Sequence, residues 1–401
     1  MTTETQPLRK LLLKSQADRR LKLGHLWIFS NEVDVKQTPL KEFSVGEQVL
    51  VCNNRDQVMG IATINPSGLI CGRIVSRSVK EPLNKDLFLK RIKQALSLRE
   101  ACFDEPCYRL IYGDSDLLPG LVVDRFNDYL VVQIATAGME ALQDVIVEAL
   151  QEVIKPAGIL LRNDHGAREF EGLELKVEAI GDVPEAVEMV ENGTKFIAPI
   201  VEGQKTGWFY DHRENRALLQ RLSPGKRVLD VFSYVGGWGV QAAVAGASEV
   251  VCVDASAQAL DWVAENASLN GVADRVSCVQ GKAINALKDM INSGEKFDIV
   301  VLDPPAFIKR KKDQKSGEAA YRHINELGIR LLKDDGLLVS ASCSMHLGKD
   351  TLVEVVRSAA RKLDKHAQIL SQGGQGADHP VHPAIPETDY LKAVFARVYT
   401  P

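Results

Sequence analysis

The spacing of hydrophobic and polar residues changes twice along the chain, and each change indicates a different kind of structure. Up to about residue 80, short β-branched runs are separated by turn-forming residues, which is typical of an all-β module. From there to about residue 196, amphipathic helices alternate with strands, and beyond residue 226 buried strands alternate regularly with helices. The pattern predicts a small all-β module at residues 1–80, a central α+β domain at residues 81–196 and an α/β domain at residues 197–401.

Individual elements follow from the same periodicity. In the first two domains, strands are predicted at Val49–Cys52, Val58–Ile64, Leu69–Val75, Leu121–Asp124, Tyr129–Ala135 and Ile159–Arg162, and helices at Asp86–Glu100 and Glu140–Ile154. In the third, strands are predicted at Arg227–Phe232, Glu249–Val253, Val276–Val279, Phe297–Leu302 and Leu337–Met345, with helices at Val240–Ala245, Ala257–Asn266 and Ile284–Ser293. Such alternation indicates a doubly wound parallel sheet, in which ligands bind at the carboxyl ends of the strands.

A glycine-rich turn between the first two strands of this sheet indicates the class of ligand. Gly236–Gly239 has the order Gly-Gly-Trp-Gly, which differs from the G-x-G-x-x-G pattern of a dinucleotide site. Asp230 precedes the turn, where a carboxylate repels a pyrophosphate but suits a cationic amino-acid group. Asp254, at the end of the second strand, is placed to accept both hydroxyls of a ribose. S-adenosylmethionine meets both requirements, and the segment resembles class I methyltransferases; the alternative is a plain βαβ unit with solvated acids.

Composition places the chain among ordinary globular proteins. Its 401 residues are 45% hydrophobic and 25% charged, and the net charge of −4 does not by itself indicate nucleic-acid binding. No apolar run approaches the ~18 residues of a membrane span and no signal-peptide core is present, so we expect a cytoplasmic protein without a membrane partner. The seven cysteines are dispersed, which argues against a disulfide framework. Neither the cysteines nor His379 and His382 have the further ligands of a metal site, and no metal is predicted.

Two basic segments are candidates for RNA contact. Near the N-terminus, cations stand beside aromatic residues, which suits phosphates and unstacked bases; the alternative is a solvated face with Trp27 in the core. The run Leu21–Val33 resembles a PUA domain, a known RNA-binding barrel. The segment Lys309–Lys315 carries five cations and one acid, and it contacts either phosphates beside a target base or only solvent. The candidate RNA-binding residues are Lys10, Arg19, Arg20, His25, Trp27, Lys309, Arg310, Lys311 and Lys312.

The segment Gly203–Arg216 is dense in polar and aromatic residues, and we favour ligand contact over a surface hairpin with a helix cap at Asp211. Its polar residues can bind a carboxylate, and Phe209 or Tyr210 can cover an adenine or a ribose. The spacing resembles the Q-K-T-G-x-[FY] lead-in of bacterial 23S rRNA methyltransferases that carry a PUA domain. The candidate donor-binding residues are Gln204, Lys205, Thr206, Gly207, Phe209, Asp230, Phe232, Ser233, Gly236, Gly237, Asp254, Ala255, Ala283 and Asp303.

Two strand ends carry the candidate chemistry. Asp303 begins a stiff Asp-Pro-Pro turn that resembles the motif with which base methyltransferases grip the target base; a structural turn is the alternative. Cys343 lies between two serines at the end of the Leu337–Met345 strand. C5 of a pyrimidine is a poor nucleophile, but addition of a thiolate to C6 gives an enamine whose C5 attacks a sulfonium methyl group. The alternative for Cys343 is a buried cysteine that packs as a small hydrophobe.

The motifs LGHLWIFS, GQKTGWF, DVFSYVGGWG, DPPAF and SCS together resemble the RlmI family of 23S rRNA cytosine-C5 methyltransferases, and the resemblance extends from Leu8 to Val398. It implies PUA, central α+β and Rossmann-like domains, S-adenosylmethionine as cofactor and 23S rRNA as partner. It also implies that Cys343 is the nucleophile and that Asp303 contacts the base. Ala306 and Phe307 occupy the place of a second cysteine, Lys282 stands where an acid usually meets the adenine amino group, and Trp238 is expected only to change packing.

The sequence therefore predicts methylation of C5 of a cytosine in 23S rRNA through a covalent adduct between Cys343 and C6. Two alternatives stay open. One is methylation of another base position, such as a guanine nitrogen, which needs no cysteine. The other is RNA binding without catalysis, which Lys282 favours. The modified nucleotide, naked rRNA or an assembled particle as substrate, and the oligomeric state, a homodimer among the options, also stay open.

Overall fold

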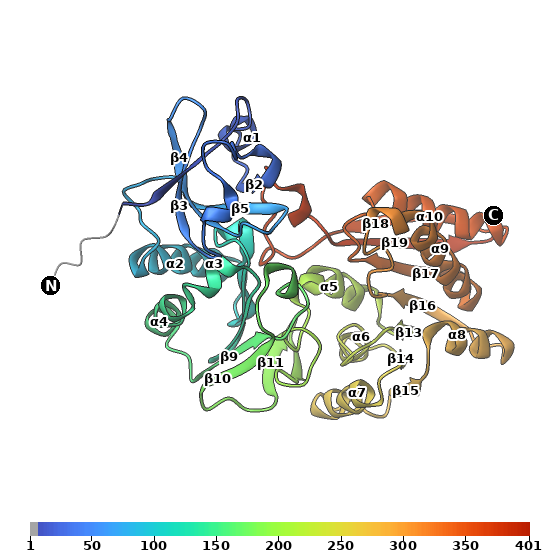
Figure 1. Cartoon of the computed structure of the whole chain (residues 1–401). Coiled ribbons are helices and arrows are strands. Elements are labelled where there is room, and N and C mark those ends of the chain that lie inside the picture. Colours follow the sequence, from blue (N-terminus) through green and yellow to red (C-terminus); the bar gives the residue numbers. More distant parts are fainter. Residues whose placement is uncertain (1–6) are drawn as a thin grey trace. The chain divides into compact units, whose positions relative to one another are not determined.

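The structure is a computed structural model that describes residues 7–401, and its elements form two compact units (Figure 1). The first unit contains the chain up to Val187, Pro199–Trp208 and Ala377–Thr388. The second unit contains Glu188–Ala198, Phe209–Gly376 and Asp389–Pro401. Because the chain leaves and re-enters both units, domains of consecutive residues only approximate them. Within residues 7–401, no helix has both the length and the apolar character of a membrane span.

A five-stranded sheet forms the β module at the start of the first unit, with the strand order β1-β3-β4-β5-β2. Its elements are β1 (Arg9–Leu12), α1 (Arg19–Lys22), β2 (Trp27–Phe29), β3 (Gln48–Cys52), β4 (Val58–Ile64) and β5 (Ile70–Ser76). Apolar side chains from all five strands meet in one core. The three predicted strands are confirmed. The strands β1 and β2 were not predicted because three or four residues are too few to show an alternating pattern.

The central part of the first unit is a sheet of order β10-β9-β8-β7-β6, and helix α2 packs against α4 and β6. Its elements are α2 (Lys85–Cys102), β6 (Cys107–Tyr112), β7 (Leu121–Phe126), β8 (Tyr129–Ile134), α3 (Ala137–Glu140), α4 (Gln143–Ile154), β9 (Gly158–Asn163) and β10 (Lys176–Gly181). The predicted strands and the first predicted helix are confirmed. The helix predicted at Glu140–Ile154 is wrong at its start, because the chain breaks between α3 and α4 at Ala141 and Leu142.

A hairpin of β11 (Val187–Glu191) and β12 (Thr194–Ala198) follows, and nearly all of it belongs to the second unit. Hydrogen bonds explain this membership: the N–H of Ile197 donates to Asn266 Oδ1 at 2.7 Å, and Arg216 Nε donates to Glu191 Oε1 at 2.6 Å. The predicted limit between residues 196 and 197 therefore cuts through β12 and is corrected to the start of the hairpin.

A seven-stranded sheet of order β15-β14-β13-β16-β17-β19-β18 forms the centre of the second unit. Its strands are β13 (Arg227–Val231), β14 (Glu249–Asp254), β15 (Val276–Gln280), β16 (Phe297–Leu302), β17 (Leu332–Ser342), β18 (His366–Gly373) and β19 (Lys392–Tyr399). Its helices are α5 (Arg213–Leu222), α6 (Gly239–Val244), α7 (Ala257–Leu269), α8 (Ala283–Asn292), α9 (Gln314–Leu331) and α10 (Lys349–Lys362). Six of the seven described strands of this sheet run in one direction, and β19 runs in the opposite direction.

Helices cover both faces of this sheet (Figure 1). Helices α6 and α7 pack against each other and against β14, whereas α9 packs against α8, α10 and β16. The predicted doubly wound α/β class is confirmed, and β16 has its predicted limits. The carboxyl ends of β13, β14, β16 and β17 lie at one edge, and the residues that follow these strands form the candidate site.

Candidate active site at the strand ends of the second unit

Asp230, in β13, holds the start of helix α6. Its Oδ2 atom accepts a hydrogen bond from the backbone N–H of Gly239 at 2.8 Å. Burial, together with the charges of Asp303 and Asp254, raises the pKa of Asp230 to about 7. Its other oxygen, Oδ1, has no hydrogen-bond donor among the described residues. Because an unsatisfied buried oxygen is costly, a cationic ligand that reached Oδ1 would stabilise the charged form.

The turn between β13 and α6 takes its shape from contacts with β14. The N–H groups of Phe232 and Ser233 both donate to the carbonyl of Val253, at 2.9 and 3.1 Å. Gly236 has a φ of 87°, and a Cβ there would lie 2.7 Å from Val240 Cγ2, so glycine lets α6 begin close to the turn. The Ser233 hydroxyl is buried and, like Asp230 Oδ1, has no partner within residues 7–401.

Asp254 ends β14 with its carboxylate already oriented. Its Oδ2 accepts from the N–H of Tyr234 at 3.0 Å, and its Oδ1 accepts from the N–H of Ser256 at 2.9 Å. Each carboxylate oxygen has a second lone pair, so both can still accept from a ribose diol. The orphaned atoms of Asp230 and Ser233 and this oriented carboxylate fit the ammonium and ribose of S-adenosylmethionine. That ligand supplies an electrophilic methyl group on a sulfonium.

The segment Gln204–Gly207 belongs to the first unit, and the structure changes the role of one of its residues. The Thr206 hydroxyl is buried and donates to Asp124 Oδ2 at 2.6 Å, so the predicted hydrogen bond from this hydroxyl to a ligand is wrong. Gly207 has a φ of 99°, and a Cβ there would lie 2.8 Å from the carbonyl oxygen of Pro199. Gln204 and Lys205 are exposed, and their contact with the donor stays a prediction.

Phe209 lies beside the glycine turn in the second unit. Its ring packs edge-on against Tyr234, with centroids 5.5 Å apart and an interplanar angle of 80°. Phe209 is half-buried, whereas Tyr210 is only 1% exposed. Of the two aromatic candidates for covering the donor, the structure therefore favours Phe209.

Asp303, after β16, accepts a hydrogen bond from one aromatic ring and lies beside a histidine ring. Trp238 Nε1 donates to its Oδ2 at 3.0 Å, and His212 Nε2 lies 3.3 Å from its Oδ1. Burial alone would raise the pKa of Asp303, but His212 and Trp238 outweigh burial and the pKa lies below its usual value. Asp303 is therefore a charged acceptor. The expectation that Trp238 only changes packing is wrong.

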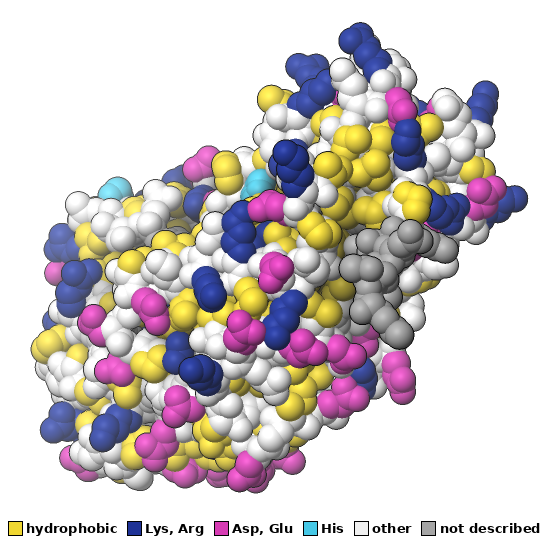
Figure 2. Space-filling view, turned by 90° about the vertical axis from the view of Figure 1, so that its left-hand side faces the viewer, with side chains coloured by type: hydrophobic (Ala, Val, Ile, Leu, Met, Phe, Trp, Pro, Cys, Tyr) yellow, Lys and Arg dark blue, Asp and Glu magenta, His cyan; other side chains and the backbone are white. Residues whose placement is uncertain are grey.

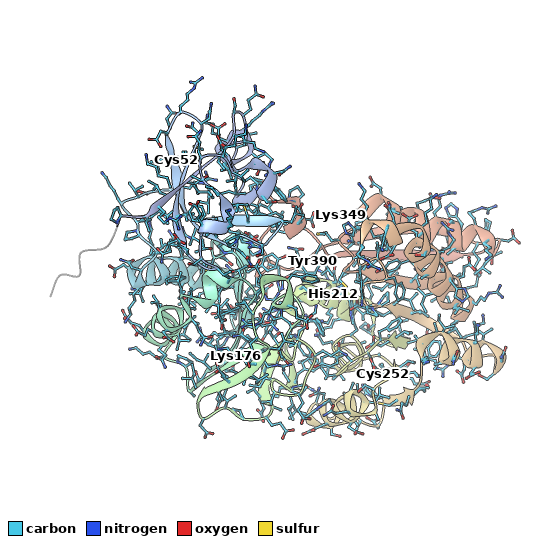
Figure 3. All side chains as sticks on the ribbon, in the orientation of Figure 1. Cys52, Lys176, His212, Cys252, Lys349 and Tyr390 are labelled. Atoms are coloured by element: carbon cyan, nitrogen blue, oxygen red, sulfur yellow. The ribbon has the colours of Figure 1, made fainter. Side chains whose placement is uncertain are left out.

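The tautomer of His212 follows from Asn215. The Nδ2 of Asn215 donates to the carbonyl of Gly374 at 2.9 Å and lies 3.1 Å from His212 Nδ1. An amide nitrogen can only donate, so Nδ1 accepts and the proton of a neutral ring sits on Nε2, facing Asp303. His212 and Tyr390 are both labelled in Figure 3. The Tyr390 hydroxyl donates to Asp211, the residue before His212, at 2.5 Å.

Cys343 follows β17 and is held from both sides by its serine neighbours. The Ser342 hydroxyl donates to the Tyr321 hydroxyl at 2.8 Å, and the Tyr321 hydroxyl lies 2.8 Å from Ser344 Oγ. The N–H of Ser344 donates back to Ser342 Oγ at 3.1 Å, and the N–H of Ile308 donates to Ser344 Oγ at 3.3 Å. This network joins the Cys343 turn to the segment that follows the Asp-Pro-Pro turn. Cys343 itself is partly exposed, so the buried alternative for this cysteine does not hold.

Sequence comparison identifies the family. The profile of S-adenosylmethionine-dependent methyltransferases matches residues 173–390, and that of a PUA-like domain matches residues 11–77. The ribosomal RNA large subunit methyltransferase I of Erwinia tasmaniensis is 35% identical over 398 residues, 97% of this chain and 99% of the relative. The protein of the same name from Shigella boydii is 34% identical over 395 residues, with the same coverage. The chain belongs to this methyltransferase family.

A solved structure shares the fold of the whole methyltransferase. A methyltransferase in complex with S-adenosylhomocysteine has a TM-score of 0.83, covering 97% of this chain and 100% of its own at 21% identity. The predicted family, the PUA-like and class I methyltransferase fold and the dependence on S-adenosylmethionine are confirmed.

The N-terminal cations of the methyltransferase are less available than the sequence suggested. Lys10 pairs with Asp56 at 2.5 Å, and Arg20 donates to both oxygens of Glu32 at 2.8 Å. Trp27 is half-buried; its Nε1 donates to Asp114 at 2.9 Å and its N–H donates to His25 Nδ1 at 3.0 Å. Arg20 and Trp27 therefore have structural roles. Arg19 is exposed on α1, and in Figure 2 the side chains that project from the upper part of the view are mostly Lys and Arg.

The second basic segment is fully available to a partner. Between the Asp-Pro-Pro turn and helix α9, the side chains of Lys309, Arg310, Lys311 and Lys312 are all exposed. Arg310 pairs with Asp313 at 3.1 Å. This segment belongs to the same unit as Cys343. Its contact with RNA stays a prediction.

The loop after β15 carries Lys282, which stands where the resemblance leads us to expect an acid. Gly281 N–H donates to the carbonyl of Asp254 at 2.9 Å, and the Lys282 side chain is exposed. Gln280, Gly281 and Lys282 line a cavity of about 640 Å³ that extends to Glu295; neither Cys343 nor Asp303 lines it. Ala255 is exposed beside Asp254 and Ala283 is half-buried at the start of α8, so both remain candidates for donor contact.

Proposed function

We propose that this methyltransferase transfers a methyl group to C5 of a cytosine in 23S rRNA, with Cys343 as the nucleophile. Relatives of at least 34% identity are named ribosomal RNA large subunit methyltransferase I, which supports a large-subunit rRNA substrate. The hydrogen-bonded turn around Cys343 is the observation that carries the choice of C5. A ring nitrogen or an exocyclic nitrogen of a base needs no thiol, whereas C5 of cytosine does.

The proposed chemistry begins and ends with the Cys343 thiolate. The Cys343 thiolate forms a bond to C6, and the C5–C6 π electrons move to C5, which takes the methyl group from the sulfonium and leaves a neutral thioether. A base then removes the proton from C5, the C5–C6 double bond is restored, and the bond between sulfur and C6 breaks to return the thiolate. The thiol must therefore be partly exposed and held in place, as Cys343 is.

Asp303 provides a reason for cytosine rather than uracil. Its carboxylate is held in the charged form by His212 and Trp238, so it can only accept hydrogen bonds. The exocyclic N4 amine of cytosine donates, whereas O4 of uracil accepts. A uracil in the same position would bring two acceptors together with no proton between them.

Exposed cations supply the sequence-independent part of RNA binding. Lys309–Lys312 in the second unit and Arg19 in the PUA-like module are positioned on exposed surfaces for phosphate contact. A cytosine in an rRNA loop would reach Cys343 at a lower cost than a paired one, which must first be extruded. A substrate of this kind also supports the expected cytoplasmic location.

The test is transfer of labelled methyl from S-adenosylmethionine to deproteinised 23S rRNA by wild type, Cys343→Ala and Cys343→Ser. We expect label on C5 of one cytosine in the wild type and at least a thousandfold slower transfer by both variants, with unchanged donor binding. Cys102→Ser, at an exposed cysteine outside the second unit, is the matched control and should keep wild-type activity. Label that survives both substitutions would instead assign the enzyme to a nitrogen target, and RNA binding without any label would support a non-catalytic role.

A further inference from the structure

Lys392 is a buried cation in direct contact with the turn that carries Cys343. It begins β19 and is the register partner of Ser342, the last residue of β17. Its Nζ donates to the carbonyl of Ser344 at 2.5 Å and to the carbonyl of Tyr390 at 2.8 Å. The residues bonded and paired to Lys392 thus flank Cys343 on both sides. The side chain is only 4% exposed, so its charge acts through protein rather than through water.

The charges around Lys392 favour an anion at Cys343. Burial lowers the pKa of Lys392 to about 8, while the charge of Cys343 and, to a smaller extent, that of Asp389 raise it. Lys349, which pairs with Asp389 at 3.1 Å and is labelled in Figure 3, lowers it. Below pH 8 the ammonium form predominates. Coupling between two charges is reciprocal, so an ammonium that is stabilised by the thiolate also stabilises the thiolate.

Two backbone carbonyls alone do not explain a buried lysine. A neutral donor would satisfy them without the cost of burying a charge. An ammonium has three N–H donors, and the carbonyls of Ser344 and Tyr390 use two of them. A cation held at this position instead supplies what the reaction needs next to a cysteine nucleophile, namely a charge that keeps the sulfur deprotonated near neutral pH.

We propose that the Lys392 ammonium maintains Cys343 as the thiolate and fixes its turn, which makes Lys392 the positioning residue for the nucleophile. This inference rests on the proposed role of Cys343 in methyl transfer. Lys392 does not touch the cytosine in this scheme; it acts on the sulfur before the bond to C6 forms and again when the thiolate leaves.

The experiment measures the pH dependence of Cys343 alkylation by iodoacetamide on the full chain, resolved by mass spectrometry of the Cys343 peptide. Wild type is compared with Lys392→Met, Lys392→Arg and Lys333→Met. Methionine keeps the length of the side chain without its charge, and arginine keeps the charge. Lys333 pairs with Asp298 at 2.9 Å near the start of β17, at the end remote from Cys343, and serves as the control.

We expect the alkylation midpoint of Lys392→Met to rise by at least about one pH unit, while Lys392→Arg and Lys333→Met stay near wild type. Methyl transfer by Lys392→Met should fall about tenfold at pH 7 and recover as the pH approaches 9, a recovery that a purely structural defect would not show. A folded Lys392→Met protein with the wild-type midpoint would overturn the inference. If that variant does not fold, Lys392→Arg decides: a wild-type midpoint supports the role of the charge, and a raised midpoint contradicts it.

Alkylation needs neither RNA nor donor, so the two proposals can fail separately. A Lys392-dependent midpoint together with label on another base would contradict C5 methylation and leave the charge coupling intact. Label on C5 that depends on Cys343 but not on Lys392 would support the proposed function and reject the role of Lys392.

Discussion

The indole N–H of Trp238 donates to the carboxylate of Asp303 at 3.0 Å, so a residue of the glycine turn orients the acid of the Asp-Pro-Pro turn. The ring of Trp238 also lies against His212, with centroids 5.0 Å apart, and His212 faces the other oxygen of Asp303. One side chain therefore joins the glycine turn, which we propose to bind the donor, to the Asp-Pro-Pro turn, which we propose to bind the base. The proposed order of donor and base around Cys343 depends on this link.

Trp238→Phe removes the donor and keeps an aromatic ring. We expect the pKa of Asp303 to rise, because burial raises it and only His212 would remain to oppose burial. The acid limb of the pH–rate profile should move to higher pH, and transfer at neutral pH should fall roughly threefold to tenfold because the acid loses its orientation. Trp262→Phe, at a half-buried position in α7, is the control. An acid limb that stays in place would contradict the role of Trp238.

Asp230→Asn should stabilise the protein without ligand and weaken donor binding. In the unfolded chain Asp230 loses its proton near pH 4. In the folded protein its pKa is raised to about 7, so the carboxyl stays protonated to a higher pH. Its burial cost is therefore absent below pH 4, grows between pH 4 and 7, and is complete above pH 7. At pH 8 asparagine removes a cost of roughly 2–4 kcal/mol. Urea unfolding at pH 4 and pH 8 checks this. The free energies of unfolding of the wild type and Asp230→Asn should differ at pH 8 but not at pH 4.

The same residue predicts how donor binding depends on pH. An ammonium bound at Asp230 requires the carboxylate, so the wild type should bind S-adenosylmethionine more tightly as the pH rises through 7 and should release a proton below it. Calorimetry in buffers of different ionisation enthalpy measures that proton. Asp230→Asn should bind at least tenfold more weakly and with no such release. Equal proton release by wild type and variant would show that another group titrates.

Sequence alone predicts those parts of the fold whose residues are close together in the chain. The strand β16 is apolar except for Asp298 and has its predicted limits, Phe297–Leu302. By contrast, β19 begins with the polar Lys392, which reads as an exposed position although the side chain is buried. The role that we propose for Lys392 depends on the position of β19, which lies antiparallel between β17 and β18. The sequence does not show this position.

In the candidate site, too, contacts between residues far apart in the chain could not be predicted from the sequence. Asp230, Asp254, Asp303 and Cys343 are identified from chemistry at strand ends, because in a doubly wound sheet any strand end is a candidate. Their partners lie far away in the chain: Trp238 is 65 residues from Asp303, and Tyr321 is 21 residues from Ser342. Thr206 was misassigned for this reason, since its acceptor, Asp124, is 82 residues distant. No local pattern contains these pairs.

Tyr321→Phe should loosen the turn that holds Cys343. The hydroxyl accepts from Ser342 and bonds Ser344, and both serines are buried, so its removal leaves buried groups without a partner. We expect a loss of about 1–3 kcal/mol in the free energy of unfolding and a larger loss in turnover than in substrate affinity. Tyr129→Phe, at a half-buried tyrosine in β8, is the control. Wild-type turnover in Tyr321→Phe would show that the serine network does not position the cysteine.

Replacement of Lys309, Arg310, Lys311 and Lys312 by alanine should weaken RNA binding without changing donor binding. Each lost phosphate contact reduces the slope of log affinity against log salt by about 0.7–0.9, so four contacts should reduce it by roughly three. The control removes four exposed cations near helix ends or the start of β13, at the amino ends of the strands: Arg221, Lys226, Arg330 and Arg361. Affinity for 23S rRNA measured from 50 to 300 mM salt distinguishes the two variants. Equal reductions by the two variants would show that net charge governs RNA binding, because only the first variant removes cations from the loop beside the Asp-Pro-Pro turn.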